Sequence, residues 1–111
     1  MERIERTDFF ELVYDIVRRI PECRVTSYGA IAKALGMGRS SRMVGQAMKN
    51  NMGDDTVPAH RVVNRIGVLT GKHSFNPPER MEQLLAAEGV EVKNDKVIRF
   101  KELFWDPMQE L

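Results

Sequence analysis

Residues 25–50 read VTSYGAIAKALGMGRSSRMVGQAMKN, and this stretch decides the fold. A hydroxyl side chain at Thr26 or Ser27 can cap a short helix. Two glycines, Gly36 and Gly38, then supply a helix stop and a tight turn before the chain becomes helical again. Two short helices joined by a glycine turn predict a helix-turn-helix.

The second helix of this pair, which Ser40 or Ser41 can cap, is expected to carry three cations. The pattern places Arg39, Arg42 and Lys49 on it, and a helix-turn-helix presents this element to DNA. The same charges also fit an ordinary solvated helix face. Pattern alone therefore leaves DNA binding open.

The segment before the helix-turn-helix also has helical spacing. Apolar residues recur from Phe9 to Ile20, Asp8 and Glu11 form a possible capping pair, and Pro21 ends the run. This pattern predicts a first helix that packs its apolar face against the rest of the chain.

The C-terminal half adds a helix and a hairpin to this outline. Asn76, followed by two prolines, predicts the start of a helix that ends before Gly89. The β-prone runs 90–92 and 97–100, separated by residues 93–96, predict a terminal hairpin or wing. We therefore expect a mainly α fold with a small β-hairpin, which is a winged helix-turn-helix DNA-binding domain.

Composition bounds the class of protein more than its function. The 111 residues are 42% hydrophobic, which predicts one compact domain over residues 1–111. Because 17 Lys and Arg nearly balance 16 Asp and Glu, net charge does not indicate a nucleic-acid partner, and any DNA-binding face must come from local clustering.

Targeting signals and bound groups are not apparent in the sequence. The single cysteine, Cys23, cannot form an internal disulfide, and Met1–Arg6 lacks the apolar run of a signal peptide. No segment approaches the roughly 20 apolar residues of a membrane span. We expect a cytoplasmic protein without membrane contact, metal or cofactor.

Three segments together show a specific resemblance. They are Val25–Ala32, Ser41–Met48 and Val57–Val63. In order and spacing they resemble the DNA-binding domain of the O6-alkylguanine-DNA alkyltransferases, and more closely the short alkyltransferase-like proteins. The resemblance extends from about Phe9 to Gly89, and the ending Leu103–Pro107 is similar to the alkyltransferase-like tail.

The position of the reactive residue departs from the repair enzymes of this family. In the repair enzymes that this chain resembles, the residue at the position of Ala59 is a cysteine. It is activated through a histidine and a glutamate that match His60 and Glu88. A methyl side chain has no lone pair and cannot accept an alkyl group. The resemblance implies that His60 and Glu88 form a retained structural network, and that no residue is catalytic.

Two further points concern this position. Alkyltransferase-like proteins commonly have tryptophan where this chain has Ala59, so the pocket is expected to be roomier, admitting large O6 adducts but forgoing aromatic contact. Cys23 is not expected to replace the missing nucleophile, because the sequence places it in a loop without the His–Glu arrangement.

The resemblance assigns roles to three other residues. Arg42 matches an arginine that enters the minor groove and takes the place of the extruded guanine in the base stack. Tyr28 matches a tyrosine that presses on the phosphate 3′ to the lesion, although aromatic packing is an alternative role. Asn51 matches an asparagine that structures the turn after the recognition helix.

The rest of the lesion pocket is implied less directly. Lys72 falls where alkyltransferase-like proteins have a cation that faces the base, but a surface lysine is an equal alternative, and the adjacent His73 could take this place. The backbone at Ala59 and Val62 matches positions that read the edge of guanine.

The resemblance implies a monomeric, non-catalytic sensor of DNA damage. It would bind double-stranded DNA containing O6-alkylguanine in the minor groove, flip the modified base and flag it for nucleotide excision repair proteins. Two alternatives remain: a winged-helix transcription regulator that reads undamaged operator DNA in the major groove, and a working alkyltransferase.

Overall fold

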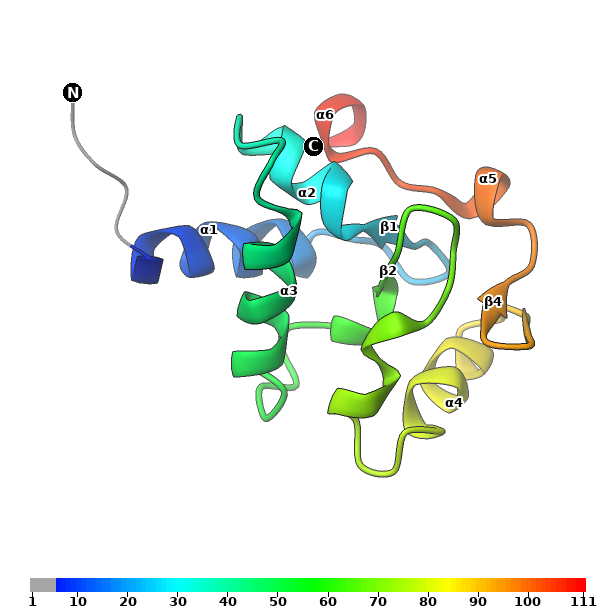
Figure 1. The fold of residues 1–111 in the computed structure, drawn as a ribbon. Coiled ribbons are helices and arrows are strands. Elements are labelled where there is room, and N and C mark those ends of the chain that lie inside the picture. Colours follow the sequence, from blue (N-terminus) through cyan, green and yellow to red (C-terminus); the bar gives the residue numbers. More distant parts are fainter. Residues whose placement is uncertain (1–5) are drawn as a thin grey trace, which may run out of the picture.

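The computed structural model describes residues 6–111, so most of the Met1–Arg6 stretch considered above lies outside the described residues. Short helices make up most of the described chain; one small sheet lies among them, and the other lies at one edge of the molecule (Figure 1). In chain order, the helices of this part are α1 (Arg6–Arg18), α2 (Tyr28–Ala34), α3 (Ser41–Asn50), the 3-10 helices η1 (Ala59–Arg61) and η2 (Thr70–Ser74), α4 (Arg80–Ala87), α5 (Phe100–Leu103) and α6 (Pro107–Glu110). The predicted mainly α class is confirmed.

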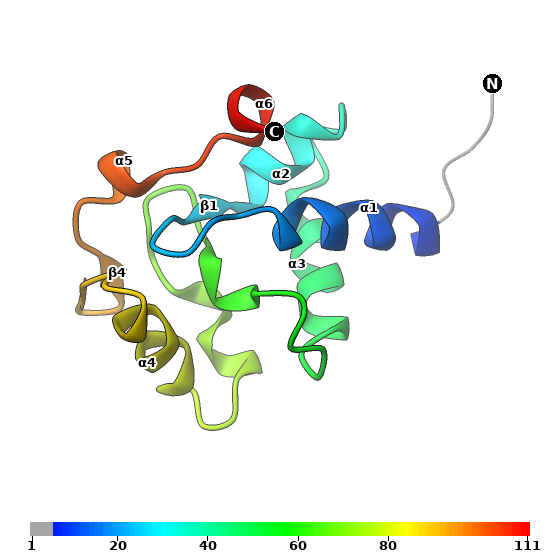
Figure 2. The ribbon, with the colours of Figure 1, turned by 180° about the vertical axis from the view of Figure 1, so that it is seen from behind.

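Helix α1 begins two residues before the predicted cap. Asp8 lies in its first turn rather than at its N-cap, close to the positive end of the helix dipole. Phe9, Val13 and Val17 are fully buried and form one stripe of the helix. Helix α1 packs against α3. It lies behind α3 in Figure 1 and in front of it in Figure 2, which shows the opposite face.

The helix-turn-helix forms as the sequence predicts. Ser27 caps α2, because its Oγ accepts a hydrogen bond of 3.1 Å from the backbone N–H of Ala30. Gly36, with a φ of +74°, follows the helix and reverses the chain toward α3. Ser40 is the N-cap of α3 but makes no capping hydrogen bond through its side chain.

A parallel strand pair that the sequence did not predict fixes the position of the following loop. Strand β1 (Thr26–Ser27) pairs with β2 (Val62–Val63), with Thr26 opposite Val62. Because β1 leads directly into α2 and β2 follows η1, this pairing holds η1, whose first residue is Ala59, near the start of α2. Two residues per strand are too few to show a periodic sequence pattern.

The wing is shorter than predicted. Strands β3 (Val92–Lys93) and β4 (Lys96–Val97) pair antiparallel, and the turn between them is Asn94–Asp95, with φ values of +52° and +62°. A two-residue turn with positive φ at both positions favours asparagine and aspartate. The second strand was predicted over residues 97–100. In the structure it ends at Val97, and Phe100 begins α5.

The fourth helix also begins later than predicted. Asn76 is not its cap; Asn76–Pro77 is a cis peptide bond, and the N-cap of α4 is Glu79, which makes no side-chain capping bond. The intervening residues form a turn closed by a hydrogen bond of 2.9 Å from Arg80 N–H to the carbonyl of Pro77. The prolines therefore precede the helix rather than start it.

Two apolar clusters form the core on either side of the β1–β2 pair. The first joins α1, α2 and α3 and includes Trp105 of the C-terminal tail. The second joins α4, the wing and the start of η2, and it includes Leu69 and Met81. The tail is held by Arg24, whose guanidinium donates to the carbonyl oxygens of Leu103 and Phe104 at 2.9 and 2.6 Å.

Candidate nucleic-acid interface

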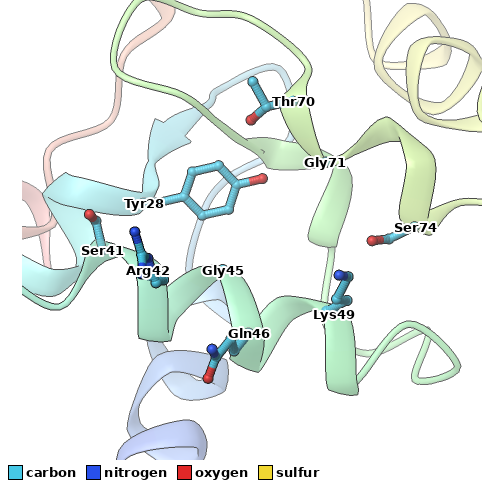
Figure 3. A pocket seen from close by; sticks show the side chains of 9 residues that line it. All are labelled: Tyr28, Ser41, Arg42, Gly45, Gln46, Lys49, Thr70, Gly71 and Ser74. Carbon is cyan, nitrogen blue, oxygen red and sulfur yellow. The ribbon is translucent and has the colours of Figure 1, made fainter.

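A hollow of about 490 Å³ opens between the helix-turn-helix and η2 (Figure 3). Helix α2 contributes its first residue, α3 contributes one face, and η2 forms the opposite wall. The lining residues are Tyr28, Ser41, Arg42, Gly45, Gln46, Lys49, Thr70, Gly71 and Ser74. We call this hollow the recognition pocket.

Tyr28 crosses the recognition pocket from α2 toward η2 (Figure 3). Burial raises the pKa of its phenol, and a hydrogen bond with the Thr70 side chain opposes that rise. Gly71 lies so close that a Cβ on it would stand 2.7 Å from the hydroxyl oxygen of Tyr28. The phenol is therefore protonated at neutral pH and is held in place by the wall opposite.

Two of the three predicted DNA-binding cations line this pocket. Arg42 and Lys49 are exposed on α3 and lie on the pocket side of that helix. Arg39 is not on the helix as predicted, because the glycine turn extends as far as Ser40. It is an exposed turn residue and does not line the recognition pocket.

Ala59, the first residue of η1, lies between two further cavities. On one side it lines a space of about 30 Å³ that shares Tyr28, Gly45 and Gly71 with the recognition pocket. This inner space is about the volume of one water molecule. On its other side Ala59 lines a hollow of about 400 Å³ beneath α4. Ala59 therefore lines both the inner space and the hollow beneath α4, together with Met52 and Phe75.

His60 and Glu88 are brought together as the resemblance implies, with Arg61 as a third member. His60 Nε2 lies 2.6 Å from Glu88 Oε2, and Arg61 donates to both carboxylate oxygens at 2.7 to 3.1 Å. Arg61 also donates to the carbonyl of Ile20 at 2.8 Å. All three side chains of the network are largely buried, at 12 to 13% exposure.

The network keeps Glu88 ionised. Burial by itself would raise the pKa of Glu88, but the hydrogen bonds from Arg61, His60 and the backbone N–H of Cys23 together lower it below its ordinary value. The Glu88 carboxylate, at the end of α4, is thus hydrogen-bonded both to the loop before β1 and to helix η1.

The expectation that Cys23 lies apart from the His–Glu arrangement is wrong. Its backbone N–H donates to Glu88 Oε1 at 3.2 Å, and its thiol donates to the backbone carbonyl of Glu88. The cause is a left-handed backbone conformation at Cys23, with a φ of +69°, that turns the loop toward the end of α4. Cys23 lines neither cavity beside Ala59.

Lys72 does not face the recognition pocket. Its ammonium pairs with the carboxylate of Asp95 in the turn of the wing, which draws the side chain away from Tyr28. His73 is exposed on η2 and lines neither the recognition pocket nor the inner space. Ser74 of the same 3-10 helix lines both.

Val62 and Asn51 have structural positions. Val62 is buried at 1% exposure, and its N–H donates to the carbonyl of Ala59, which closes η1. Asn51 caps α3 through its backbone, and its carbonyl accepts from the N–H of Asp54 at 3.1 Å.

Sequence reasoning missed Arg61 and the η2 wall. Arg61 directly follows His60 in the sequence. This adjacency could have indicated that both side chains share one buried carboxylate partner. Thr70, Gly71 and Ser74 gave no comparable signal because a short 3-10 helix has no distinctive pattern. Within residues 6–111, no group of three His, Cys, Asp or Glu side chains could hold a metal ion, and no helix is long and apolar enough to cross a membrane.

Comparison with known families places this geometry in context. Residues 8–90 match the family described as 6-O-methylguanine DNA methyltransferase, DNA binding domain. The chain is 36% identical to Alkyltransferase-like protein 1 of Schizosaccharomyces pombe, over 90% of this chain and 96% of that protein. It is 40% identical to the DNA base-flipping protein of Escherichia coli, over 95% of this chain and 81% of the relative.

Solved structures agree with these sequence matches. The S. pombe Atl1 structure in complex with damaged DNA containing O6-carboxymethylguanine superposes with a TM-score of 0.82 at 34% identity, covering 95% of this chain and 98% of that chain. The structure of a Mycobacterium tuberculosis OGT variant has a TM-score of 0.65 at 34% identity, covering 79% of this chain and 52% of the other. The winged helix-turn-helix fold is thus shared with a protein solved on damaged DNA.

Proposed function

The chain belongs to the family of the 6-O-methylguanine DNA methyltransferase DNA-binding domain, and on this premise we propose that it binds O6-alkylguanine in duplex DNA without removing the alkyl group. One observation carries the proposal. Ala59 lines the inner space that shares Tyr28, Gly45 and Gly71 with the recognition pocket, and it directly precedes His60, which pairs with Glu88. Its methyl group offers no electron pair to the alkyl carbon, so the recognition machinery is present without the acceptor.

The recognition pocket supports base flipping from the minor groove. Arg42 is exposed at the start of α3, where its planar guanidinium can fill the gap left in the base stack. Tyr28 stands beside it, with its hydroxyl fixed near Gly71, and can press on the phosphate next to the flipped nucleotide. A side chain inserted between bases also kinks the duplex, so the complex is a bent one.

The cavities around Ala59 support the tolerance of large adducts. The flipped base enters from the recognition pocket, and its O6 substituent points past the Ala59 methyl group toward the hollow of about 400 Å³. The inner space of about 30 Å³ must widen for this to occur. Side chains of Met52 and Phe75 line both cavities, so their rotation opens the path.

The complex then serves as a signal for other repair proteins. A protein that holds the lesion without changing it leaves the damage in place, so a second activity must excise it. We assign that activity to nucleotide excision repair proteins and the sensor to a monomer in the cytoplasm. The resemblance to alkyltransferase-like proteins supports this assignment.

The decisive experiment follows the alkyl group. The chain is incubated with a duplex that carries one O6-methylguanine with a tritiated methyl group, and protein and DNA are separated under denaturing conditions. We expect a stable complex in native gels, with all of the label recovered in the DNA. Label on the protein would reject the proposal, and a parallel Cys23→Ser variant would then show whether Cys23 had accepted it.

A further inference from the structure

A second hollow, of about 650 Å³, lies on the wing side of the molecule. It opens between the loop after β2, strand β4 and the segment around α5. The lining residues are Ser27, Arg65, Ile66, Lys96, Val97, Arg99, Phe100, Lys101 and Phe104. We call it the wing groove, and it shares no lining residue with the recognition pocket.

The rim of the wing groove is strongly cationic. Four of its lining residues are Arg65, Lys96, Arg99 and Lys101, and none is acidic. In a chain with 17 basic and 16 acidic residues, this is a local concentration of one sign. Within residues 6–111, Arg99 alone of the four forms an ion pair, with Glu102 at 2.6 Å. Three cations are left to meet charges from outside.

The floor of the wing groove is apolar and already formed. The rings of Phe100 and Phe104 meet edge to face, with centroids 5.6 Å apart, and the buried Val97 lines the groove beside them. Phe100 is seated on Gly67, where an added Cβ would stand 3.0 Å from the ring and where φ is +91°. Ile66 completes the floor at 52% exposure. A cavity of this kind suits an inserted apolar side chain.

We propose that the wing groove binds a short acidic segment of a partner protein that carries one apolar anchor residue. The anchor side chain would cover the Phe100–Phe104 floor, and flanking carboxylates would pair with the cations of the rim. Contacts with DNA phosphates do not account for this floor, because they are made to charged and polar groups alone. Since the two pockets are separate, this inference does not depend on lesion recognition.

The test uses four fluorescein-labelled peptides, each with acidic residues flanking one central anchor, which is Phe, Trp, Leu or Ile. Fluorescence anisotropy is measured on the full chain, and a peptide with alanine at the anchor is the control. We expect saturable binding of at least one anchored peptide and about fivefold or more weaker binding of the alanine control. Amide chemical shifts of Ile66, Lys96 and Lys101 should move in nitrogen–proton correlation spectra.

Variants separate the wing groove from general charge effects. Lys101→Glu and Ile66→Ser, both at exposed positions, should each weaken peptide binding about fivefold. Lys33→Glu, an exposed matched change on α2 outside the groove, should have little effect. The proposal is overturned if no anchored peptide binds saturably, if the anchor makes no difference, or if a short single-stranded oligothymidylate displaces the peptide.

Discussion

His60 Nε2 lies 2.6 Å from Glu88 Oε2, and this largely buried contact connects the residue after Ala59 to the end of α4. In a repair enzyme such a pair would activate a thiol, but here the residue before the histidine is alanine. Arg61 occupies both oxygens of the same carboxylate. The pair therefore holds the loop in shape, and its energetic role can be measured as stability.

Glu88→Gln should lower the free energy of unfolding by about 2–3 kcal/mol, because the change leaves the buried Arg61 without a charged partner. Urea titration followed by circular dichroism measures this value. Glu82→Gln, an exposed change on the same helix, should stay within about 0.5 kcal/mol of the parent. Equal stability of the two variants would contradict the structural role of the network.

The same network predicts an acid-sensitive stability. Since the pKa of Glu88 is lowered in the folded chain, its contribution is fully present above the ordinary value of 4.5 and is lost as the pH falls through the lower, folded value. The difference in unfolding free energy between the parent and Glu88→Gln should therefore shrink below about pH 4.5. A difference that stays constant from neutral pH into this acid range would assign the effect to packing alone.

Arg42→Ala should weaken binding to an O6-methylguanine duplex about tenfold or more, because the stack replacement is lost. The loss of affinity that Arg42→Ala causes should be smaller on an undamaged duplex, because there the change removes only the attraction between one positive charge and the DNA. Arg39→Ala is the matched control. Because Arg39 is a turn residue outside the recognition pocket, it should contribute equally to the affinity for both duplexes, through salt-dependent contacts with DNA phosphates. Equal losses for the two variants on the damaged duplex would remove Arg42 from the flipping step.

Gly71→Ala should impair lesion binding selectively. The added methyl group meets the hydroxyl of Tyr28 at 2.7 Å, so the ring must move out of its place in the recognition pocket. Gly53→Ala is the control, because an added Cβ there meets nothing within 4 Å. Anisotropy titrations on damaged and undamaged duplexes give the comparison. If lesion binding in Gly71→Ala equals that of the parent, the position of Tyr28 is not important for recognition.

Ala59→Trp should shift adduct preference toward small groups. The indole would fill the boundary between the inner space and the hollow beneath α4, which closes the route for a long O6 substituent. Ala59→Ser, which changes the volume little, should preserve the preference of the parent. The measurement is the ratio of affinities for O6-benzylguanine and O6-methylguanine duplexes. An unchanged ratio in Ala59→Trp would show that the substituent takes another path.

The sequence predicted the parts of the fold that local chemistry controls. Ser27 caps α2 and Gly36 ends it, because a hydroxyl acceptor and a positive φ are properties of single residues. The pairing of His60 with Glu88 was implied by family resemblance. Arg39 was misplaced because a turn of two glycines leaves the start of the next helix uncertain by a few residues.

Other features depend on contacts between distant segments. The parallel pairing of Thr26 with Val62 has no local signature, yet it sets the distance between α2 and Ala59. Lys72 was assigned to the base pocket from its position in the chain, but its partner Asp95 lies in a turn that only the folded wing brings near. Cys23 reaches Glu88 because the left-handed backbone at Cys23 turns the loop before β1 toward the end of α4, a contact between segments far apart in the chain.

The most direct test of lesion recognition is one titration series. Matched duplexes with guanine, O6-methylguanine or O6-benzylguanine at a single position are titrated with the chain at one fixed salt concentration. We predict about tenfold or more tighter binding to both modified duplexes than to the guanine duplex, a difference of about 1.4 kcal/mol or more. Equal affinity for all three duplexes, or a stronger preference for an undamaged sequence, would contradict lesion recognition.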